Sequence, residues 1–453
     1  MKENSTRLRI GIISTMSGFA WGGSEELWAA TALEALRLGH EVFISVFAWP
    51  ERPPRLRELE RGGAKILRRH NPALGFGSSI GAASSYRDLF KTNPDVILIS
   101  QGWSFDVVVR SDLMELLYVT PIPFVLVCQF NENLPVLADD SRREHASNIF
   151  SRASRVLFVS NRNRIEAERQ LARTISNAGL ILNPVNLSDR SYLSWPDSRT
   201  ARFASVGRLE TRPKGQDILI EALSAEQWKQ RDWHLTIYGS GPDKRYLCSL
   251  VKFFGLQERI TFARHESNVR TIWAQEQVLV MFSRAEGTPL ALVEAMLCGR
   301  PAIVSDVGGN QEWIAETETG FLAEAATIGL ARAALERAWS ARQNWTEMGM
   351  QAHKFATHKI GDPSMPGLLE ILLDAWQQKK PTVATTREEL EQLKRYRGLI
   401  HPTIGRQVEC AAEAGALRLR NMVARWRSAR AESQQRSLAR LAAPRGIARP
   451  WLQ

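Results

Sequence analysis

Short apolar runs alternate with stretches of helical periodicity along the first part of the chain. Between the first two runs, residues 24–38 carry apolar side chains at helical spacing, and Gly39 follows at a position that commonly ends a helix. Strand and helix in alternation predict a parallel sheet covered by helices. The predicted strands are residues 8–14, 41–48, 95–100, 122–128 and 155–160.

The composition changes over residues 183–201. This segment is polar and contains two prolines, as connections between domains often do. The alternation then resumes, which predicts a second doubly wound unit. In open α/β sheets ligands bind beyond the carboxyl ends of the strands, so we expect the chemistry to lie in a cleft between the two units. The second set of predicted strands is 203–206, 234–238, 259–262, 278–282 and 301–305, with helices at 215–224, 244–254 and 289–297.

Length and composition agree with two globular domains. A chain of 453 residues is too long for a single hydrophobic core, and 44% hydrophobic residues exclude a wholly disordered chain. No apolar run reaches the ~18–20 residues of a membrane span, and the N-terminal residues lack the apolar segment of a secretory signal. The four cysteines show neither metal-ligand spacing nor a disulfide framework. We therefore expect a cytoplasmic protein with reduced cysteines.

Positive charge is concentrated at the C-terminus. The formal net charge is +11, and residues 381–453 contribute +8 of it through 14 basic and six acidic side chains. Within this tail, residues 408–441 carry an apolar helical stripe with arginines beside it, which could bind an anionic membrane surface from the cytoplasmic side. The alternative is a helix packed on a partner or on the protein itself. Nucleic acid is disfavoured as a partner because aromatic residues for base stacking are nearly absent.

The most informative motif begins at Glu286 and reads EGTPLALVE. Thr288 is a good helix N-cap and Pro289 suits the first turn, so residues 287–290 would offer backbone N–H groups to an anion. Glu294 lies five residues past Pro289, ~7.5 Å along a helix axis. The two carboxylates could accept hydrogen bonds from hydroxyls of one ligand. The alternative is an ordinary strand-to-helix turn with two solvated acids.

Two further loops are predicted at the same cleft. Arg208 and Lys214 follow the first strand of the second unit, and an arginine fork with a lysine suits a diphosphate. Gly22 and Gly23 lie between the first strand and the first helix, where glycine lets a ligand approach the backbone and Ser24 could cap the helix. Either loop could instead be a plain connector.

Together these motifs resemble family 4 of the retaining glycosyltransferases. The motifs that carry the resemblance are Gly-Arg-Leu and Lys-Gly at 207–215, Tyr-Gly-Ser-Gly-Pro at 238–242, the two glutamates of 286–294, Gly-x-Pro at 299–301 and Gly-Gly-x-x-Glu at 308–312. The resemblance covers about residues 8–375. It implies the GT-B architecture of two Rossmann-like domains facing across a cleft, and a metal-independent, retaining transfer of a hexose-type sugar from a nucleotide diphosphate sugar. No cofactor besides this donor is implied.

The resemblance also implies roles for individual residues. Arg208 and Lys214 would contact the donor diphosphate. Glu286 would hold hydroxyls of the transferred sugar, and Glu294 would hold the ribose of the nucleotide. We take Glu286, Arg208 and Lys214 as the catalytic set. The other donor contacts would come from Gly22, Gly23, Gly287, Thr288, Pro289 and Leu290.

Two positions depart from the family pattern: Gln129, and Arg264, where the family usually has glycine. Many members carry a histidine after the strand that here ends at Cys128, whereas this chain has Gln129. Glutamine cannot act as a base, so its implied role is a hydrogen bond to the sugar or the acceptor. The departure at Gln129 keeps open a catalytically silent member that only binds a nucleotide sugar. Another nucleotide-sugar enzyme, such as an epimerase, is a further alternative.

We thus predict four segments and one function. Residues 1–185 form an acceptor-side Rossmann-like domain, 186–360 a donor domain, 361–380 a crossover helix region and 381–453 a basic helical tail. The predicted reaction transfers a sugar to a glycan or lipid-linked acceptor, in the synthesis of a cell-surface polysaccharide or glycolipid.

Overall fold

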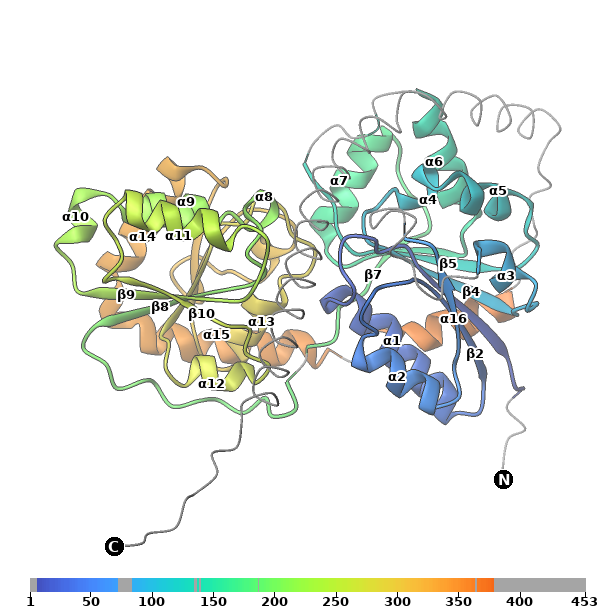
Figure 1. Cartoon of the computed structure of the whole chain (residues 1–453), viewed down its shortest axis with the longest axis horizontal. Helices are drawn as coiled ribbons and strands as arrows, with labels where there is room; N and C mark the ends of the chain where they lie inside the picture. The colour runs from blue at the N-terminus through green and yellow to red at the C-terminus, as the bar shows by residue number, and fades with distance from the viewer. Residues whose placement is uncertain are drawn as a thin grey trace, which may run out of the picture.

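The computed structural model describes residues 6–71, 84–133, 137, 140–185, 187–362 and 365–378. The predicted basic tail, including the membrane-binding segment 408–441, lies outside the described residues. Two α/β domains lie side by side, each built on its own parallel sheet (Figure 1). This is the predicted fold class of two Rossmann-like domains.

The first domain contains a seven-stranded sheet in the order β3-β2-β1-β4-β5-β6-β7, and every neighbouring pair is parallel. All five predicted strands are present, whereas β3 and β7 at the two edges were not predicted. The strands are β1 (Arg9–Ser14), β2 (Glu41–Phe47), β3 (Lys65–Arg69), β4 (Val96–Gln101), β5 (Phe124–Cys128), β6 (Arg155–Phe158) and β7 (Ala178–Leu180).

Helices cover both faces of this sheet because its strands are apolar on both sides. One face is covered by α1 (Gly23–Arg37), α2 (Pro54–Arg61) and α16 (Leu368–Gln378). Thus α16, close to the C-terminal end of the described chain, crosses back and packs on the first domain (Figure 1). The other face carries α3 (Tyr86–Phe90), α4 (Asp106–Val109), α5 (Ser111–Val119), α6 (Asp140–Arg152) and α7 (Asn161–Leu171).

The second domain contains a six-stranded parallel sheet in the order β10-β9-β8-β11-β12-β13. Five strands were predicted, and only the edge strand β13 was not. The strands are β8 (Ala201–Val206), β9 (Trp233–Tyr238), β10 (Ile260–Ala263), β11 (Val278–Met281), β12 (Ala302–Ser305) and β13 (Gly320–Ala323). The helices are α8 (Thr211–Lys214), α9 (Gln216–Leu223), α10 (Glu226–Lys229), α11 (Lys244–Phe253), α12 (Val269–Trp273), α13 (Leu290–Leu297), α14 (Ile328–Ser340) and α15 (Trp345–Ile360), with 3₁₀ turns η3 (Asn310–Glu312) and η4 (Arg342–Asn344).

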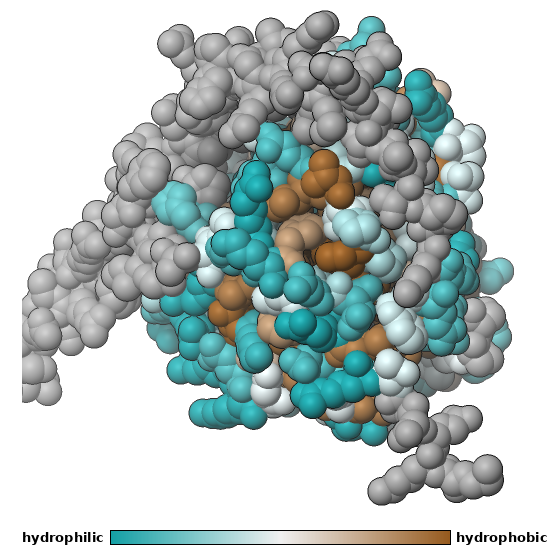
Figure 2. Space-filling model, turned by 90° about the vertical axis from the view of Figure 1, so that its right-hand side faces the viewer, coloured by the Kyte–Doolittle hydropathy of each residue, from teal (hydrophilic) through white to brown (hydrophobic). Residues whose placement is uncertain are grey.

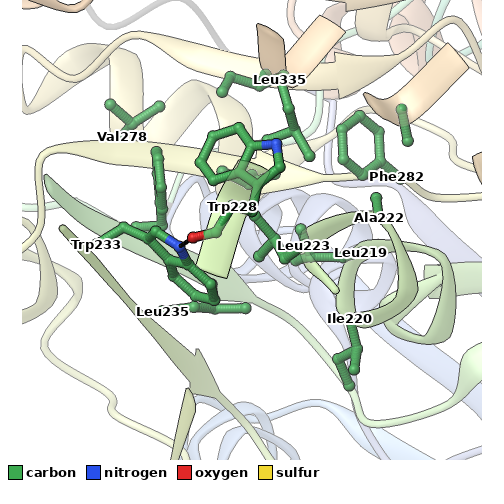
Figure 3. Close-up of a cluster of buried hydrophobic side chains, with 14 of the residues drawn as sticks. Leu219, Ile220, Ala222, Leu223, Trp228, Trp233, Leu235, Val278, Phe282 and Leu335 are labelled. Carbon is green, nitrogen blue, oxygen red and sulfur yellow. Dashed lines mark hydrogen bonds between the residues drawn. The ribbon is translucent and has the colours of Figure 1, made fainter. Parts of the chain in front are cut away.

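Tryptophan rings pack among aliphatic side chains in the core on one face of the second sheet (Figure 3). Trp228 of α10 is fully buried, and its carbonyl accepts a 2.6 Å hydrogen bond from Nε1 of Trp233 on β9. The ring of Trp228 also makes edge contacts with Phe203 and Trp339. Such aromatic pairs add ~0.5–1.5 kcal/mol each beyond the burial of their area. This cluster fixes β8, the strand that leads into the site.

Arginines hold the polar connection between the domains: Arg270 donates to the carbonyls of Asp189 and Ser191, and Arg300 to two carbonyls further along. Arg300 is 0% exposed, and its guanidinium donates to the carbonyl oxygens of Leu193 at 3.1 Å and Ser194 at 2.8 Å. It also donates to the carbonyls of Trp273 and Cys298, which end α12 and α13. Burying an arginine costs free energy unless its donors are satisfied. Arg300 therefore fastens the connection to the second domain.

The described surface and helices were considered for membrane contact. Figure 2 shows the end of the molecule formed by the first domain, where hydrophilic residues cover most of the described surface and hydrophobic ones gather in separate patches near its middle. Among the described helices, none combines the length and the apolar character needed to cross a bilayer.

Candidate functional site

The predicted cationic and acidic residues of the second domain lie at the point where the strand order of its sheet reverses, between β8 and β11. Arg208 follows the end of β8, Lys214 ends α8, and Glu286 lies in the loop between β11 and α13. Loops at the carboxyl ends of strands next to such a reversal form the usual ligand crevice of open α/β sheets. The fold thus brings Glu286 to a pair of basic residues that lie more than 70 positions earlier in the sequence.

Lys214 and Glu286 form the centre of this group. The ammonium of Lys214 lies 2.7 Å and 2.9 Å from the two carboxylate oxygens of Glu286. Ser283, which was not predicted, donates from its hydroxyl to the same carboxylate at 2.7 Å. Glu286 is only 5% exposed, so its contacts with Lys214 and Ser283 replace the water that a surface carboxylate would have. The sequence offered one signal for this contact: Ser283 lies three residues before Glu286, the first glutamate of the motif.

Two glycines set the backbone around this pair. Gly215 has φ +60°, and a Cβ there would lie 1.9 Å from the carbonyl oxygen of Phe282. Gly308 has φ +52°, and its Cβ would lie 2.2 Å from the carbonyl oxygen of Glu286. Only glycine fits such left-handed, close-packed positions. The Lys-Gly and Gly-Gly-x-x-Glu motifs therefore position Lys214 and Glu286.

Arg208 extends toward the first domain. Its guanidinium carbon lies 4.3 Å from the ring centre of Phe19, which belongs to the loop after β1, and it also forms an ion pair with Glu210. Burial lowers the pKa of Arg208 from its usual value. An arginine held against an aromatic ring with part of its fork free suits recognition of a phosphate.

The start of α13 differs from the prediction. The helix begins at Leu290 with Pro289 at the N-cap, so the prediction that Thr288 caps it is wrong. The hydroxyl of Thr288 instead donates to the carbonyl of Val159 in the first domain at 2.8 Å. The N–H of Leu290 donates to the carbonyl of Thr288 and is not available to a ligand. Within the described ranges, the N–H groups of Gly287 and Thr288 have no acceptor.

Glu294 lies on α13 and is partly buried. Burial raises the pKa of its carboxyl to about 7. No described residue donates a hydrogen bond to it, so an incoming hydroxyl would find free acceptor oxygens.

The two domains meet at the predicted glycine loops. A Cβ on Gly23 would lie 2.5 Å from the side chain of Leu290, and one on Gly287 would lie 2.0 Å from the carbonyl oxygen of Gln129. The backbone N–H of Arg162, at the start of α7, donates to the Glu312 carboxylate at 3.0 Å. These contacts bring the glycine loop of the first domain against the start of α13.

The first turn of α1 also differs from the prediction. Gly22 is the N-cap of α1 and makes no side-chain cap, so the prediction that Ser24 caps this helix is wrong. The Ser24 hydroxyl donates to Glu25 instead, and the hydroxyl of Ser14 donates to the same carboxylate at 3.0 Å. Burial raises the pKa of Glu25. Sequence reasoning did not single out this buried acid.

Gln129 is engaged inside the first domain. Its amide nitrogen donates to the carbonyl of Ser24 at 3.2 Å, and its amide oxygen accepts from Asn183 at 2.9 Å. The residue is 5% exposed. In this arrangement the side chain ties the end of β5 to the glycine loop.

Metal ligands were sought in the same region. Among residues 6–71, 84–133, 137, 140–185, 187–362 and 365–378, no three His, Cys, Asp or Glu side chains lie close enough to hold a metal ion.

The second domain matches a known protein family. Residues 200–338 match the family Glycosyl transferases group 1. A 163-residue region is 29% identical to an uncharacterized glycosyltransferase of Haemophilus influenzae, covering 35% of this chain and 45% of that protein. A 192-residue region is 28% identical to the D-inositol 3-phosphate glycosyltransferase of Gordonia bronchialis, covering 40% and 42%. The matched regions thus span less than half the length of these curated relatives.

Solved structures share the whole two-domain fold. The structure of Anabaena HepE in complex with UDP superposes with a TM-score of 0.58 at 19% identity, covering 84% of this chain and 100% of that one. Sucrose-phosphate synthase of Thermosynechococcus elongatus gives a TM-score of 0.60 at 18% identity over the same shares. At this identity the likeness shows the GT-B fold.

Proposed function

We propose that this chain, which carries a glycosyl transferases group 1 domain, transfers a sugar from a nucleotide diphosphate sugar to an acceptor with retention of configuration and without a metal. One observation carries the proposal: Arg208, Lys214 and Glu286 converge at the strand-order reversal of the second sheet, facing the glycine loop of the first domain. The names of the relatives and the UDP and UDP-glucose in the titles of the Anabaena structures support it.

The chemistry follows from the charges. The donor diphosphate would bind between Arg208 and Lys214 and accept from the free N–H groups of Gly287 and Thr288. Positioned donors of this kind stabilise the charge that develops on the leaving phosphate. As Lys214 turns to the phosphate, the carboxylate of Glu286 becomes free to accept hydrogen bonds from sugar hydroxyls. The leaving phosphate can take the proton of the attacking acceptor hydroxyl, so Gln129 is not required as a base.

The acceptor is proposed to be a glycan or a lipid-linked molecule of cell-surface polysaccharide or glycolipid synthesis. The proposal that the protein works at a membrane rests on the basic stripe of residues 408–441. In the full-length chain, replacing the arginines of this stripe by glutamine should reduce sedimentation with anionic vesicles and leave nucleotide binding unchanged. Equal sedimentation of both proteins would remove the membrane from the proposal. The replaced residues are Arg418, Arg420, Arg425, Arg427 and Arg430.

The test of the reaction has two stages. A thermal-shift panel of nucleotide diphosphates, starting with UDP, identifies the donor base because a ligand that binds the folded state raises its stability. Turnover is then measured as nucleotide diphosphate released together with a glycosylated product. Glu286→Ala should abolish turnover, whereas Glu318→Ala, the same change at an exposed site of the same domain, should not.

The alternatives give different results in this assay. A silent member would bind the donor and release no nucleotide diphosphate with any acceptor. An epimerase would convert one nucleotide sugar into another without releasing the nucleotide. Failure of every nucleotide to bind would refute the proposal itself.

A further inference from the structure

A buried arginine of the first domain, Arg69, forms no ion pair with any described residue. Arg69 is the last residue of β3 and is 3% exposed. Its guanidinium carbon lies 4.2 Å from the ring centre of Phe47 and 4.0 Å from that of Tyr86. Fully buried arginines are rare unless they are paired. The two rings hold this one in place without supplying a negative charge.

The donors of Arg69 are only partly used. Nη2 donates to the carbonyl of Ser14, at the end of β1, and lies 3.3 Å from the carbonyl of Ser45 on β2. Nε and Nη1 are buried and meet no acceptor among the described residues. A buried guanidinium with open donors costs free energy, and such groups in folded proteins call for an explanation.

A second arginine lies against the same ring. The guanidinium carbon of Arg110, which follows α4, is 4.9 Å from the ring centre of Phe47. Its Nη2 donates to the hydroxyl of Ser17 at 3.1 Å, and its buried Nε has no acceptor in the described part of the chain. Arg110 is partly exposed, so one end of this arginine pair is open.

Neighbouring carboxylates do not neutralise the pair. Within the described residues, no carboxylate lies within ion-pair distance of Arg69 or Arg110. Asp106 is the nearest acid to Arg110 along α4, and its Oδ2 already accepts from the N–H groups of Gly102 at 3.1 Å and Trp103 at 3.3 Å. Burial raises the pKa of Asp106, and the charge of Arg110 acts in the opposite direction. Asp112, at the start of α5, acts on Arg69 only at longer range.

The arginine pair lies at the carboxyl ends of the strands of the first sheet, and this side of the sheet faces the proposed donor site. Ser14 and Phe47, which contact Arg69, also line a pocket beside it. The lining of this pocket also includes Phe19, the ring that contacts Arg208 of the second domain, and the acidic residue Glu25. Ser17, whose hydroxyl accepts from Arg110, lies in the same loop as Phe19. The loop after β1 thus contacts both the donor-side arginine and the arginine pair.

We propose that Arg69 and Arg110 form a subsite for an anionic group, a phosphate monoester or a carboxylate, carried by the acceptor. Naming the ligand an acceptor rests on the proposed function, whereas the anion binding itself does not. Two guanidinium forks with open N–H groups match the oxygens of such an anion, and its charge offsets the repulsion between the two cations.

The experiment is calorimetric titration of the full-length protein with inorganic phosphate and with succinate, at constant ionic strength and with UDP saturating the proposed donor site. Arg110→Gln removes the more exposed fork, Arg110→Lys keeps the charge without the fork, and Arg69→Met removes the buried one. Arg7→Gln is the control. Arg7 pairs with Glu41, which begins β2 and therefore lies at the amino ends of the strands, on the opposite side of the sheet from Arg69.

We expect Arg110→Gln to raise the Kd of the preferred anion at least tenfold and to leave the Kd of UDP unchanged. Arg69→Met should do the same if it folds, Arg110→Lys should lie between, and Arg7→Gln should match the wild type. Whichever of phosphate and succinate binds more tightly assigns the class of the anion. A wild-type protein that binds neither anion, or a folded Arg110→Gln whose Kd stays within twofold of the wild type, would overturn the subsite. Failure of UDP to bind would count against the proposed function alone.

Discussion

Glu294→Gln is expected to stabilise the protein at alkaline pH. The carboxyl of Glu294 has a pKa of about 7 in the folded chain, raised by burial from the model-peptide value of 4.5. The folded state therefore keeps a proton on Glu294 at pH values where the unfolded state has released it. Between about pH 4.5 and 7 the folded state binds more protons, so the free energy of unfolding falls as the pH rises through this window.

The size of the effect follows from the shift. One pKa unit corresponds to about 1.4 kcal/mol, so above pH 7 the ionised carboxylate costs at most on the order of 3 kcal/mol. Glutamine has a similar shape and no charge, and it removes this cost. For domains of 150–250 residues each kcal/mol moves Tm by roughly 2–4 °C. Glu294→Gln should therefore raise Tm by several degrees at pH 8.5 and by almost nothing at pH 4.5.

The assay is differential scanning calorimetry of wild type and variant across this range. Glu324→Gln is the matched control, because Glu324 is exposed in the same domain. The reasoning is refuted if the difference in Tm between Glu294→Gln and wild type does not grow with pH, or if the control shows the same growth. UDP binding provides a second measurement. If ribose hydroxyls donate to Glu294, the increase in Tm that UDP causes in the wild type should be larger at pH 8.5 than at pH 5.5.

Two further predictions concern the scaffold of the site. Gly308→Ala would place a Cβ 2.2 Å from the Glu286 carbonyl oxygen in a left-handed conformation, so we expect a lower Tm and weaker UDP binding, and unchanged values for both would contradict the packing argument. Arg300→Leu would leave the buried carbonyls of the interdomain connection without donors and should cost ~3–5 kcal/mol in urea unfolding. Arg284→Leu, at an exposed ion pair, should cost no more than ~1 kcal/mol, and equal costs for the two variants would show that burial of Arg300 is unimportant.

The elements that sequence reasoning missed share a physical cause. Strand β3 reads Lys-Ile-Leu-Arg-Arg and is the last strand on its side of the described sheet, where polar residues are tolerated. Strands β7 and β13 are short and also lie at edges. The central strands are buried on both faces and read as continuous apolar runs, which is why they were predictable.

The capping errors have a different cause. Both Ser24 and Thr288 are residues that commonly cap helices, and both lie at predicted helix starts. In the folded chain the hydroxyl of Thr288 donates to Val159 of the other domain, and that of Ser24 donates to Glu25. A local signal cannot show that a partner from a distant segment will compete for the same hydroxyl.

The sequence by itself determined the two α/β units, the order of the central strands along the chain and the motif residues that follow them, because hydrophobic periodicity and glycine placement are local properties. Only the tertiary structure decided how those residues are used. Lys214 is paired with Glu286, Gln129 is held inside the first domain, and Arg69 is buried with two donors that meet no acceptor among the described residues. Burial and charge pairing depend on segments far apart in the chain, so the electrostatic state of each residue is set when the two sheets and their loops come together.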